Sequence, residues 1–231
     1  MTPEIKFYGV EDVYSDTGID LTLLRRNLQF SPTQRLERGL SALEFAKALQ
    51  QAGSKINTRQ SQPIARGADM SLNLEMIIRQ LHIHKVDYVL IGGQAMTVQG
   101  SAHITFDLAI CYARTPQNIA ALATALAPYH AYMRGSPVGL PFQFDSKTIE
   151  AGLNFTLQTD LGEVDVLGEV SGLGRFDKVL AKSEPKDLFG VSVQVLTIDG
   201  LLAAKKAAGR VKDRNHILEL EEMKKIHDAG Q

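Results

Sequence analysis

Tyr88-Val-Leu-Ile-Gly-Gly-Gln-Ala-Met96 joins a short apolar run to a pair of glycines and then to residues that favour a helix. The pattern predicts a strand over 87–91, a tight turn at Gly92 and Gly93, and a short helix through Met96. Glycines in such a turn let backbone N–H groups approach a phosphate closely. The turn is therefore a candidate phosphate site, although a glycine pair after a strand often forms only a tight turn.

A second segment, Thr105-Phe-Asp-Leu-Ala-Ile110, opens the next predicted strand, over 107–112, with an acidic residue. Metal-dependent nucleotidyl transfer usually needs two carboxylates at i and i+2, because these positions point to the same face of a strand and share a metal pair. Asp107 supplies the first carboxylate, whereas Ala109 occupies the position of the second. The sequence therefore holds only half of this pair.

The composition is that of an ordinary globular protein. Of 231 residues, 44% are hydrophobic and 22% are charged, which is enough apolar material for one or two folded domains. The formal net charge of −1 gives no overall attraction for nucleic acid, so any basic surface must be local. The single cysteine, Cys111, excludes an intrachain disulfide and a cysteine-based zinc site.

The N-terminal residues predict no targeting to a membrane. Met1-Thr-Pro-Glu-Ile-Lys6 lacks the apolar centre of a signal peptide. No segment approaches the roughly 18 apolar residues that a bilayer-spanning helix needs. We therefore expect a cytoplasmic protein with no membrane partner, and a reducing compartment fits the lone cysteine.

Turn-forming residues divide the chain into two parts. Ser31-Pro-Thr-Gln34 has the residues of a capping box with proline at the first helical position, and Gly53 is expected to end a helix of about 20 residues. The polar segment 54–69 is typical of a linker. We expect residues 1–70 to form an N-terminal helical appendage with a polar linker, and residues 71–231 to form the main domain.

The main domain alternates helical and strand patterns. The predicted hairpin is marked by Asp160-Leu-Gly162 between two alternating segments. The predicted fold class is α/β, of the α+β type, with a mixed β-sheet covered by helices. Besides the elements above, we expect helices over 72–84, 115–128, 201–208 and 213–227 and strands over 154–159, 163–168 and 191–198.

Two later segments contribute charged residues. Glu163 and Asp165 lie in phase on a predicted strand, where the simplest interpretation is a solvent-facing position. The run Lys205-Lys-Ala-Ala-Gly-Arg-Val-Lys-Asp-Arg214 holds five basic residues against one acid. A solvated helix end explains many such runs, and the alternative is contact with a phosphate.

Four segments, spread over about residues 72–227, together resemble the nucleotidyltransferase superfamily of the polymerase-beta type. In particular, the chain is similar to the minimal and abortive-infection-type nucleotidyltransferases of bacterial toxin–antitoxin systems. The resemblance implies the nucleotidyltransferase fold. It rests on Ile91-Gly-Gly-Gln-Ala95, Thr105-Phe-Asp107, Glu163-Val-Asp165 and the run from Lys205 to Asp213, which occur in the family's order.

The resemblance also implies roles for the glycines and carboxylates. Gly92 and Gly93 match the turn that contacts the triphosphate. Asp107 and Asp165 match the first and third carboxylates, which bind Mg²⁺ or Mn²⁺ in the family. Ala109 stands where the second carboxylate belongs. Glu163 is in phase with Asp165 and is an alternative metal ligand, but Asp165 is preferred because it matches the family position.

The basic run matches a nucleotide-binding segment of the family. The resemblance implies that Lys205, Arg210 and Lys212 neutralise the triphosphate or an RNA backbone. Arg210 is the first choice because a guanidinium can hold a phosphate through two hydrogen bonds. The match is loose at His103, where a basic residue is common, and at His216, where an acidic residue is common.

These matches imply metal-dependent transfer of a nucleoside monophosphate from an NTP to a hydroxyl of RNA, tRNA included, or of a partner protein. A toxin–antitoxin setting implies a cognate toxin or antitoxin as partner. Because Ala109 replaces a metal carboxylate, we expect activity to be low or absent, whether the alanine is natural or engineered. The alternative function is a non-catalytic nucleotide- or RNA-binding module, or an antitoxin-like interaction module, with the same fold.

Overall fold

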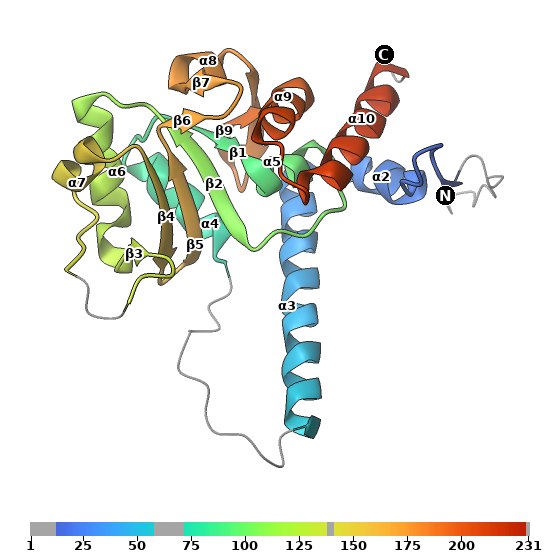
Figure 1. Ribbon diagram of the computed structural model, residues 1–231, viewed down its shortest axis with the longest axis horizontal. Coiled ribbons are helices and arrows are strands. Elements are labelled where there is room, and N and C mark those ends of the chain that lie inside the picture. Colours follow the sequence, from blue (N-terminus) through green and yellow to red (C-terminus); the bar gives the residue numbers. More distant parts are fainter. Residues whose placement is uncertain (1–12, 58–71, 138–140, 230–231) are drawn as a thin grey trace.

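A seven-stranded sheet forms the centre of the computed structural model, which describes residues 13–57, 72–137 and 141–229 (Figure 1). The strand order is β3-β4-β5-β2-β1-β9-β8. The β2–β5 and β1–β9 pairs are parallel and the other pairs are antiparallel, so the predicted mixed sheet is confirmed. The strands are β1 (Tyr88–Ile91), β2 (Asp107–Tyr112), β3 (Tyr132–Met133), β4 (Asn154–Thr159), β5 (Gly162–Leu167), β8 (Ser183–Leu188) and β9 (Val191–Leu196).

Helices cover this sheet, and the described part of the chain is helical near both its first and its last residues. The predicted fold class is therefore confirmed. A small separate hairpin pairs β6 (Glu169–Val170) with β7 (Gly174–Arg175). The α-helices are α2 (Leu21–Leu28), α3 (Pro32–Asn57), α4 (Leu74–Ile83), α5 (Gly92–Gln99), α6 (Pro116–Leu126), α7 (Ser146–Ala151), α8 (Phe176–Leu180), α9 (Ile198–Ala208) and α10 (Asp213–Ala229). None of these described helices is both long and apolar enough to cross a membrane.

Capping side chains begin α3 and α6 where the sequence predicted, whereas α9 begins earlier than predicted, at Ile198, and is capped by Thr197. Ser31 and Gln34 form the reciprocal bonds of a capping box at α3, since the Gln34 N–H donates to Ser31 Oγ at 3.2 Å and the Ser31 N–H donates to Gln34 Oε1 at 2.9 Å. Thr115 accepts a bond from the Asn118 N–H at the start of α6. Local side-chain chemistry therefore fixes where these two helices begin.

The end of α3 differs from the prediction. The helix continues through Gly53 to Asn57, so the expectation that Gly53 ends it was wrong. A glycine in a helix interior costs only about 1 kcal/mol relative to alanine, which the surrounding helical hydrogen bonds outweigh. Residues 54–57 of the predicted linker are therefore helical, and its remainder, 58–69, lies outside the described residues.

Strand β8 was not predicted, and its sequence explains why. Ser183-Glu-Pro-Lys-Asp-Leu188 is mostly polar and carries a proline, which argues against a central strand. The strand lies at the edge of the sheet, and among the described strands it pairs only with β9. Proline and charged side chains are tolerated at a sheet edge because one side of the strand needs no hydrogen-bond donors.

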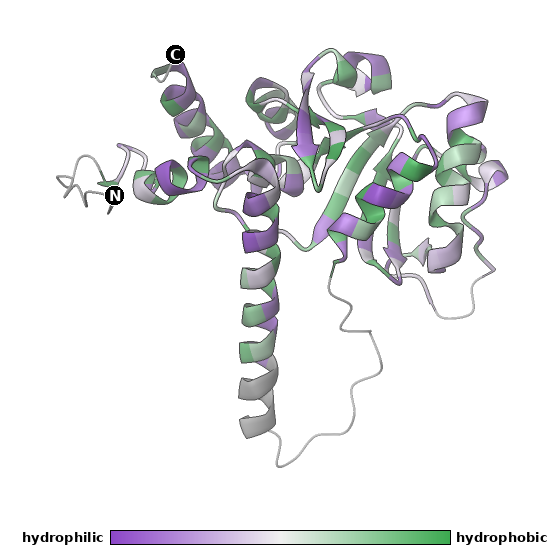
Figure 2. Cartoon of the chain, turned by 180° about the vertical axis from the view of Figure 1, so that it is seen from behind, coloured by the Kyte–Doolittle hydropathy of each residue, from purple (hydrophilic) through white to green (hydrophobic). Residues whose placement is uncertain are grey.

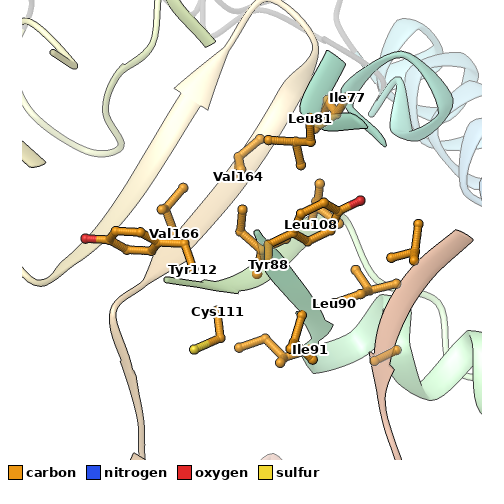
Figure 3. Close-up of a cluster of buried hydrophobic side chains, with 14 of the residues drawn as sticks. Ile77, Leu81, Tyr88, Leu90, Ile91, Leu108, Cys111, Tyr112, Val164 and Val166 are labelled. Atoms are coloured by element: carbon orange, nitrogen blue, oxygen red, sulfur yellow. The ribbon is translucent and has the colours of Figure 1, made fainter. Parts of the chain in front are cut away.

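The central strands bury an apolar layer on the face covered by α4. Figure 2 shows hydrophobic residues concentrated along these strands, and Figure 3 shows Leu81 of α4 beside Val164 of β5. Leu108 of β2 is fully buried in the same cluster. Cys111 is also fully buried, and burial raises the pKa of its thiol to about 12. The lone cysteine is therefore a core residue, and its thiol stays protonated at neutral pH.

The first half of α3 packs on the main domain through α5. Leu36 of α3 is 1% exposed and belongs to the same hydrophobic cluster as the central strands. The Arg35 guanidinium donates to the carbonyl oxygens of Asn27 at 2.9 Å and Val98 at 2.5 Å, which ties α3 both to the end of α2 and to α5. Farther along, α3 extends beyond the rest of the domain (Figures 1 and 2). The division at residue 70 stays a prediction, and these contacts provide a way to test it.

We expect Leu36→Ala to lower the free energy of unfolding of the whole chain by about 2–5 kcal/mol, because it leaves a cavity in the shared core. Leu49→Ala is the matched control on the same helix, since Leu49 is 57% exposed, and we expect it to change the free energy by less than about 0.5 kcal/mol. Urea unfolding followed by circular dichroism measures both. Two separate transitions, only one of them shifted by Leu36→Ala, would instead support an independent N-terminal part.

Candidate functional site

The glycine turn lies where β1 passes into α5. Gly92 is the first residue of the helix and has φ of +68°, in the left-handed region that favours glycine. The N-cap position is Ile91, which provides no side-chain hydrogen bond to the first turn. An uncapped first turn presents backbone N–H donors and the positive end of the helix dipole, and both attract an anion.

Both glycines are required by a close approach to β2 and to the residues just before it. A Cβ atom at Gly92 would lie 3.0 Å from the Cβ of Ala109. A Cβ atom at Gly93 would lie 2.6 Å from the Cβ of Thr105 and 2.7 Å from its Oγ1. No side chain fits at Gly93 unless Thr105 moves, so the turn stands directly against the start of β2.

Three carboxylates share the sheet face on which this turn lies, and we call Asp107, Glu163 and Asp165 the carboxylate cluster. The parallel register of β2 and β5 pairs Asp107 with Glu163 and Ala109 with Asp165. Side chains directly opposite one another on neighbouring strands point to the same face. The structure therefore brings the predicted Asp107 and Asp165 onto adjacent strands, with Ala109 beside Asp165.

Asp107 has a fixed partner within its own segment. Thr105 Oγ1 donates a hydrogen bond to Asp107 Oδ1 at 2.6 Å. The same threonine side chain fills the space beside Gly93. Thr105 thus links the glycine turn to the first carboxylate. The sequence analysis did not identify this role, because a threonine two residues before an aspartate is not a distinctive motif.

Arg134 is a site residue that the sequence analysis missed. Its Nη2 donates to Asp165 Oδ1 at 2.5 Å, and its Nη1 donates to Glu163 Oε2. Its backbone N–H donates to the Thr156 carbonyl on β4 at 2.9 Å, which fixes the main chain next to β4, one strand away from β5. The only signal in the sequence was its place at the start of the Gly/Pro-rich segment 134–141. That segment has no spacing that identifies a partner.

Burial and charge act against each other in this ion-pair network. Burial raises the pKa of Asp165, and nearby Asp107 adds to the increase, although the Arg134 guanidinium opposes it. Burial lowers the pKa of Arg134, but the stronger combined attraction of Asp165 and Glu163 raises it overall. The guanidinium therefore stays charged. Its positive charge stabilises the ionised form of the half-buried Asp165 carboxylate.

The carboxylate cluster does not fit a metal ion in this conformation. Carboxylate oxygens are ligands that Mg²⁺ prefers. However, the described residues contain no group of three or more His, Cys, Asp or Glu side chains arranged to hold a metal ion. Two of the three carboxylates instead bind the guanidinium of Arg134. The positive charge that the cluster contacts thus comes from the chain itself.

The predicted basic residues lie in two different environments. Lys205 Nζ donates to Asp213 Oδ1 at 3.0 Å and lies 2.9 Å from His216 Nδ1, in a largely buried group between α9 and α10. Arg210 and Lys212 are exposed in the connection between these helices, and neither has an ion-pair partner among the described residues. Lys205 is therefore held by Asp213, whereas the other two predicted residues face solvent.

His103 contacts the buried group around Lys205. Its ring contacts the His216 ring at a centroid distance of 4.2 Å with an interplanar angle of 60°. Burial is the main cause that lowers its pKa; Lys205 and Lys212 lower it further, whereas Glu219 and, to a smaller extent, Asp107 oppose this shift. The imidazole therefore lies against the Lys205–His216 group of α9 and α10, in the segment that leads into β2 at Asp107.

No protein-family model and no curated protein matches the sequence. The solved structures that are similar to the chain include two crystal structures of other proteins. The lincomycin-bound lincosamide antibiotic adenylyltransferase LnuA has 13% sequence identity and a TM-score of 0.45, and the match covers 66% of this chain and 99% of that chain. A Thermotoga maritima protein described as a candidate nucleotidyltransferase has 15% identity and a TM-score of 0.41, with 68% and 99% covered. These values are too low to support an argument about function.

We expect Gly93→Ala to lower the free energy of unfolding by about 1–3 kcal/mol, because the new methyl group overlaps the Thr105 side chain. Gly39→Ala, in helix α3, is the matched control. A Cβ at Gly39 would meet only the Cγ2 atom of Thr97, at an ordinary contact distance of 3.8 Å. The control should be neutral or up to about 1 kcal/mol more stable. Urea midpoints measure both, and equal effects of the two substitutions would contradict the close approach.

Proposed function

We propose that the chain binds a nucleoside triphosphate at the Gly92–Gly93 turn. We further propose that its reaction is transfer of a nucleoside monophosphate to a hydroxyl of RNA or of a partner protein. The single observation that carries the proposal is the uncapped first turn of α5, held against the start of β2 beside Asp107. A triphosphate there would meet backbone donors on one side and the α9–α10 cations on the other.

Arg210 and Lys212 are the proposed cationic contacts of the triphosphate or of an RNA backbone. Both are exposed and lack ion-pair partners among the described residues, so a phosphate would not have to displace a carboxylate. Lys205 would have to leave Asp213 to take the same role. We therefore give Arg210 and Lys212 the direct contacts and Lys205 a longer-range contribution to the positive potential.

The transfer activity of the unmodified chain is proposed to be low. Ala109 leaves the family's second metal carboxylate missing, and Arg134 occupies Glu163 and Asp165. Asp107 and Asp165 remain the proposed ligands of the Mg²⁺ or Mn²⁺ that the resemblance implies. They would be available only in a conformation in which Arg134 has released Asp165. The acceptor, the toxin–antitoxin setting and the cognate partner are proposed from the same resemblance.

A non-catalytic module is the second candidate function, and two observations favour it. The first is the missing carboxylate at Ala109 together with the internal Arg134 ion pairs, since both features oppose catalysis. The second is the exposure of Phe45 and Leu49 on the part of α3 that extends from the domain, at 66% and 57%. Exposed apolar side chains spaced four residues apart on a helix are suited to contact with another protein.

We expect Ala109→Asp to increase transfer of labelled nucleotide to RNA or protein by orders of magnitude when Mg²⁺ or Mn²⁺ is present. The new carboxylate would project beside Asp165 and on the same face as Asp107. Ala109→Asn is the matched control, because it has almost the same shape without the charge. The measurement is product formation with each of the four NTPs, with total RNA and with the protein alone.

The assay also distinguishes the two candidate functions. A folded Ala109→Asp variant with transfer above the Ala109→Asn control supports an impaired nucleotidyltransferase. A folded Ala109→Asp variant that binds NTP but transfers nothing favours the binding module. Thermal unfolding in the presence and absence of metal shows whether the added carboxylate is tolerated, since an unpaired buried carboxylate is destabilising.

We expect Arg210→Ala to weaken NTP binding about tenfold or more, because it removes a charge-assisted contact to phosphate. Arg79→Ala is the matched control, since Arg79 lies on α4 and pairs with Glu75 at 2.8 Å on an exposed surface. Isothermal titration calorimetry with a non-hydrolysable NTP analogue measures both affinities. Equal affinities would support the alternative interpretation, in which the basic run is a solvated helix end that does not contact phosphate.

A further inference from the structure

We propose that Arg134 is a built-in competitor of divalent cations, which lowers the metal affinity of the carboxylate cluster by occupying Glu163 and Asp165. The inference rests on the proposed function, because it concerns the same acidic face, and it adds a residue that the family resemblance did not assign. Arg134 belongs to the chain itself, so its competition acts at every metal concentration. The contacts, the backbone anchor and the charge balance each support this role.

The side-chain contacts use both terminal nitrogens of the guanidinium. Nη2 binds Asp165 Oδ1 at 2.5 Å and Nη1 binds Glu163 Oε2. The two carboxylates lie two residues apart on one strand, so they point to the same face and a single planar fork reaches both. An ion that binds the same oxygens must first displace these hydrogen bonds.

The backbone of Arg134 is anchored next to the oxygens that its side chain binds. Strand β3 ends at Met133, which pairs with Leu157 of β4, and the Arg134 N–H bonds to Thr156 O. Thr156 is the register partner of Asp165 across β4 and β5. The guanidinium is therefore held close to Asp165 by the sheet itself, which reduces the entropy that it loses on forming the ion pairs.

The charge balance makes the competition strong. Among the described residues, Arg134 is the one cation in ion-pair contact with Glu163 or Asp165. The Asp165 side chain is only 20% exposed and the Arg134 side chain 29%, so water screens the pair incompletely. Without the guanidinium, three carboxylates on one face would be left to attract a divalent cation.

The test measures Mn²⁺ binding to the full chain by isothermal titration calorimetry, without nucleotide. Arg134→Met removes the guanidinium but keeps most of the aliphatic stem. We expect this variant to bind Mn²⁺ with a dissociation constant about tenfold lower, or lower still. Arg79→Met, on α4, is the matched control and should leave the constant unchanged. Adding Asp165→Asn to Arg134→Met should remove the gain, which would identify the carboxylate cluster as the binding site.

Two results overturn the proposal. One is an unchanged Mn²⁺ affinity in an Arg134→Met variant that unfolds cooperatively. The other is a gain in affinity that survives Asp165→Asn. If Arg134→Met does not fold, Arg134→Gln replaces it, because glutamine removes the charge but keeps a side chain that can hydrogen-bond to a carboxylate. An Mn²⁺ affinity of that variant equal to the unmodified protein's also overturns the proposal.

A parallel titration with ATP and with the other three NTPs separates this inference from the proposed function. Tighter Mn²⁺ binding by Arg134→Met with no NTP binding by any variant would support the competitor role and overturn the proposed function. NTP binding by the unmodified chain with no effect of Arg134→Met on Mn²⁺ would do the reverse. The two proposals can therefore fail independently.

Discussion

The close approach of the glycine turn to β2 is the constraint on which the candidate site depends. Gly92 and Gly93 have no side chains, and the space that such side chains would need is filled by Ala109 and Thr105. Because the turn lies this close, the first residues of α5 lie beside the start of β2. Thr105 in turn fixes the position of the Asp107 carboxylate, because its hydroxyl donates a 2.6 Å hydrogen bond to Asp107 Oδ1. One packing contact therefore fixes both the anion-attracting and the acidic side of the site.

The strand directions explain why residues far apart in sequence meet at this edge. Strand β1 is antiparallel to β2, so the end of β1 at Ile91 lies beside the start of β2. Strand β5 is parallel to β2, so it begins at the same edge with Glu163 opposite Asp107. A mixed sheet is required for this convergence, because an entirely parallel order would bring the end of β1 to the opposite end of β2.

The sequence predicted the features that depend on local patterns. Alternation with period two identified β4 and β5 and showed that Asp165 and Glu163 share a face. It did not predict Arg134, because the ion pairs join segments about 30 residues apart and depend on the β3–β4 register. It also ended α3 too early at Gly53, where helical hydrogen bonds outweigh the local preference of glycine. Such failures are expected wherever tertiary contacts outweigh local propensity.

Packing alone does not explain the alanine at position 109, and charge offers a better account. Ala109 already brings a Cβ to within 3.0 Å of a Cβ built at Gly92, and aspartate would begin from the same atom. Alanine and aspartate at position 109 therefore differ mainly in the negative charge that aspartate would add. With alanine, one guanidinium faces three carboxylates; with aspartate, it would face four, two of them on adjacent strands at positions 109 and 165. The missing carboxylate and Arg134 thus act in the same direction, since both reduce the negative charge that would draw a metal ion to this face.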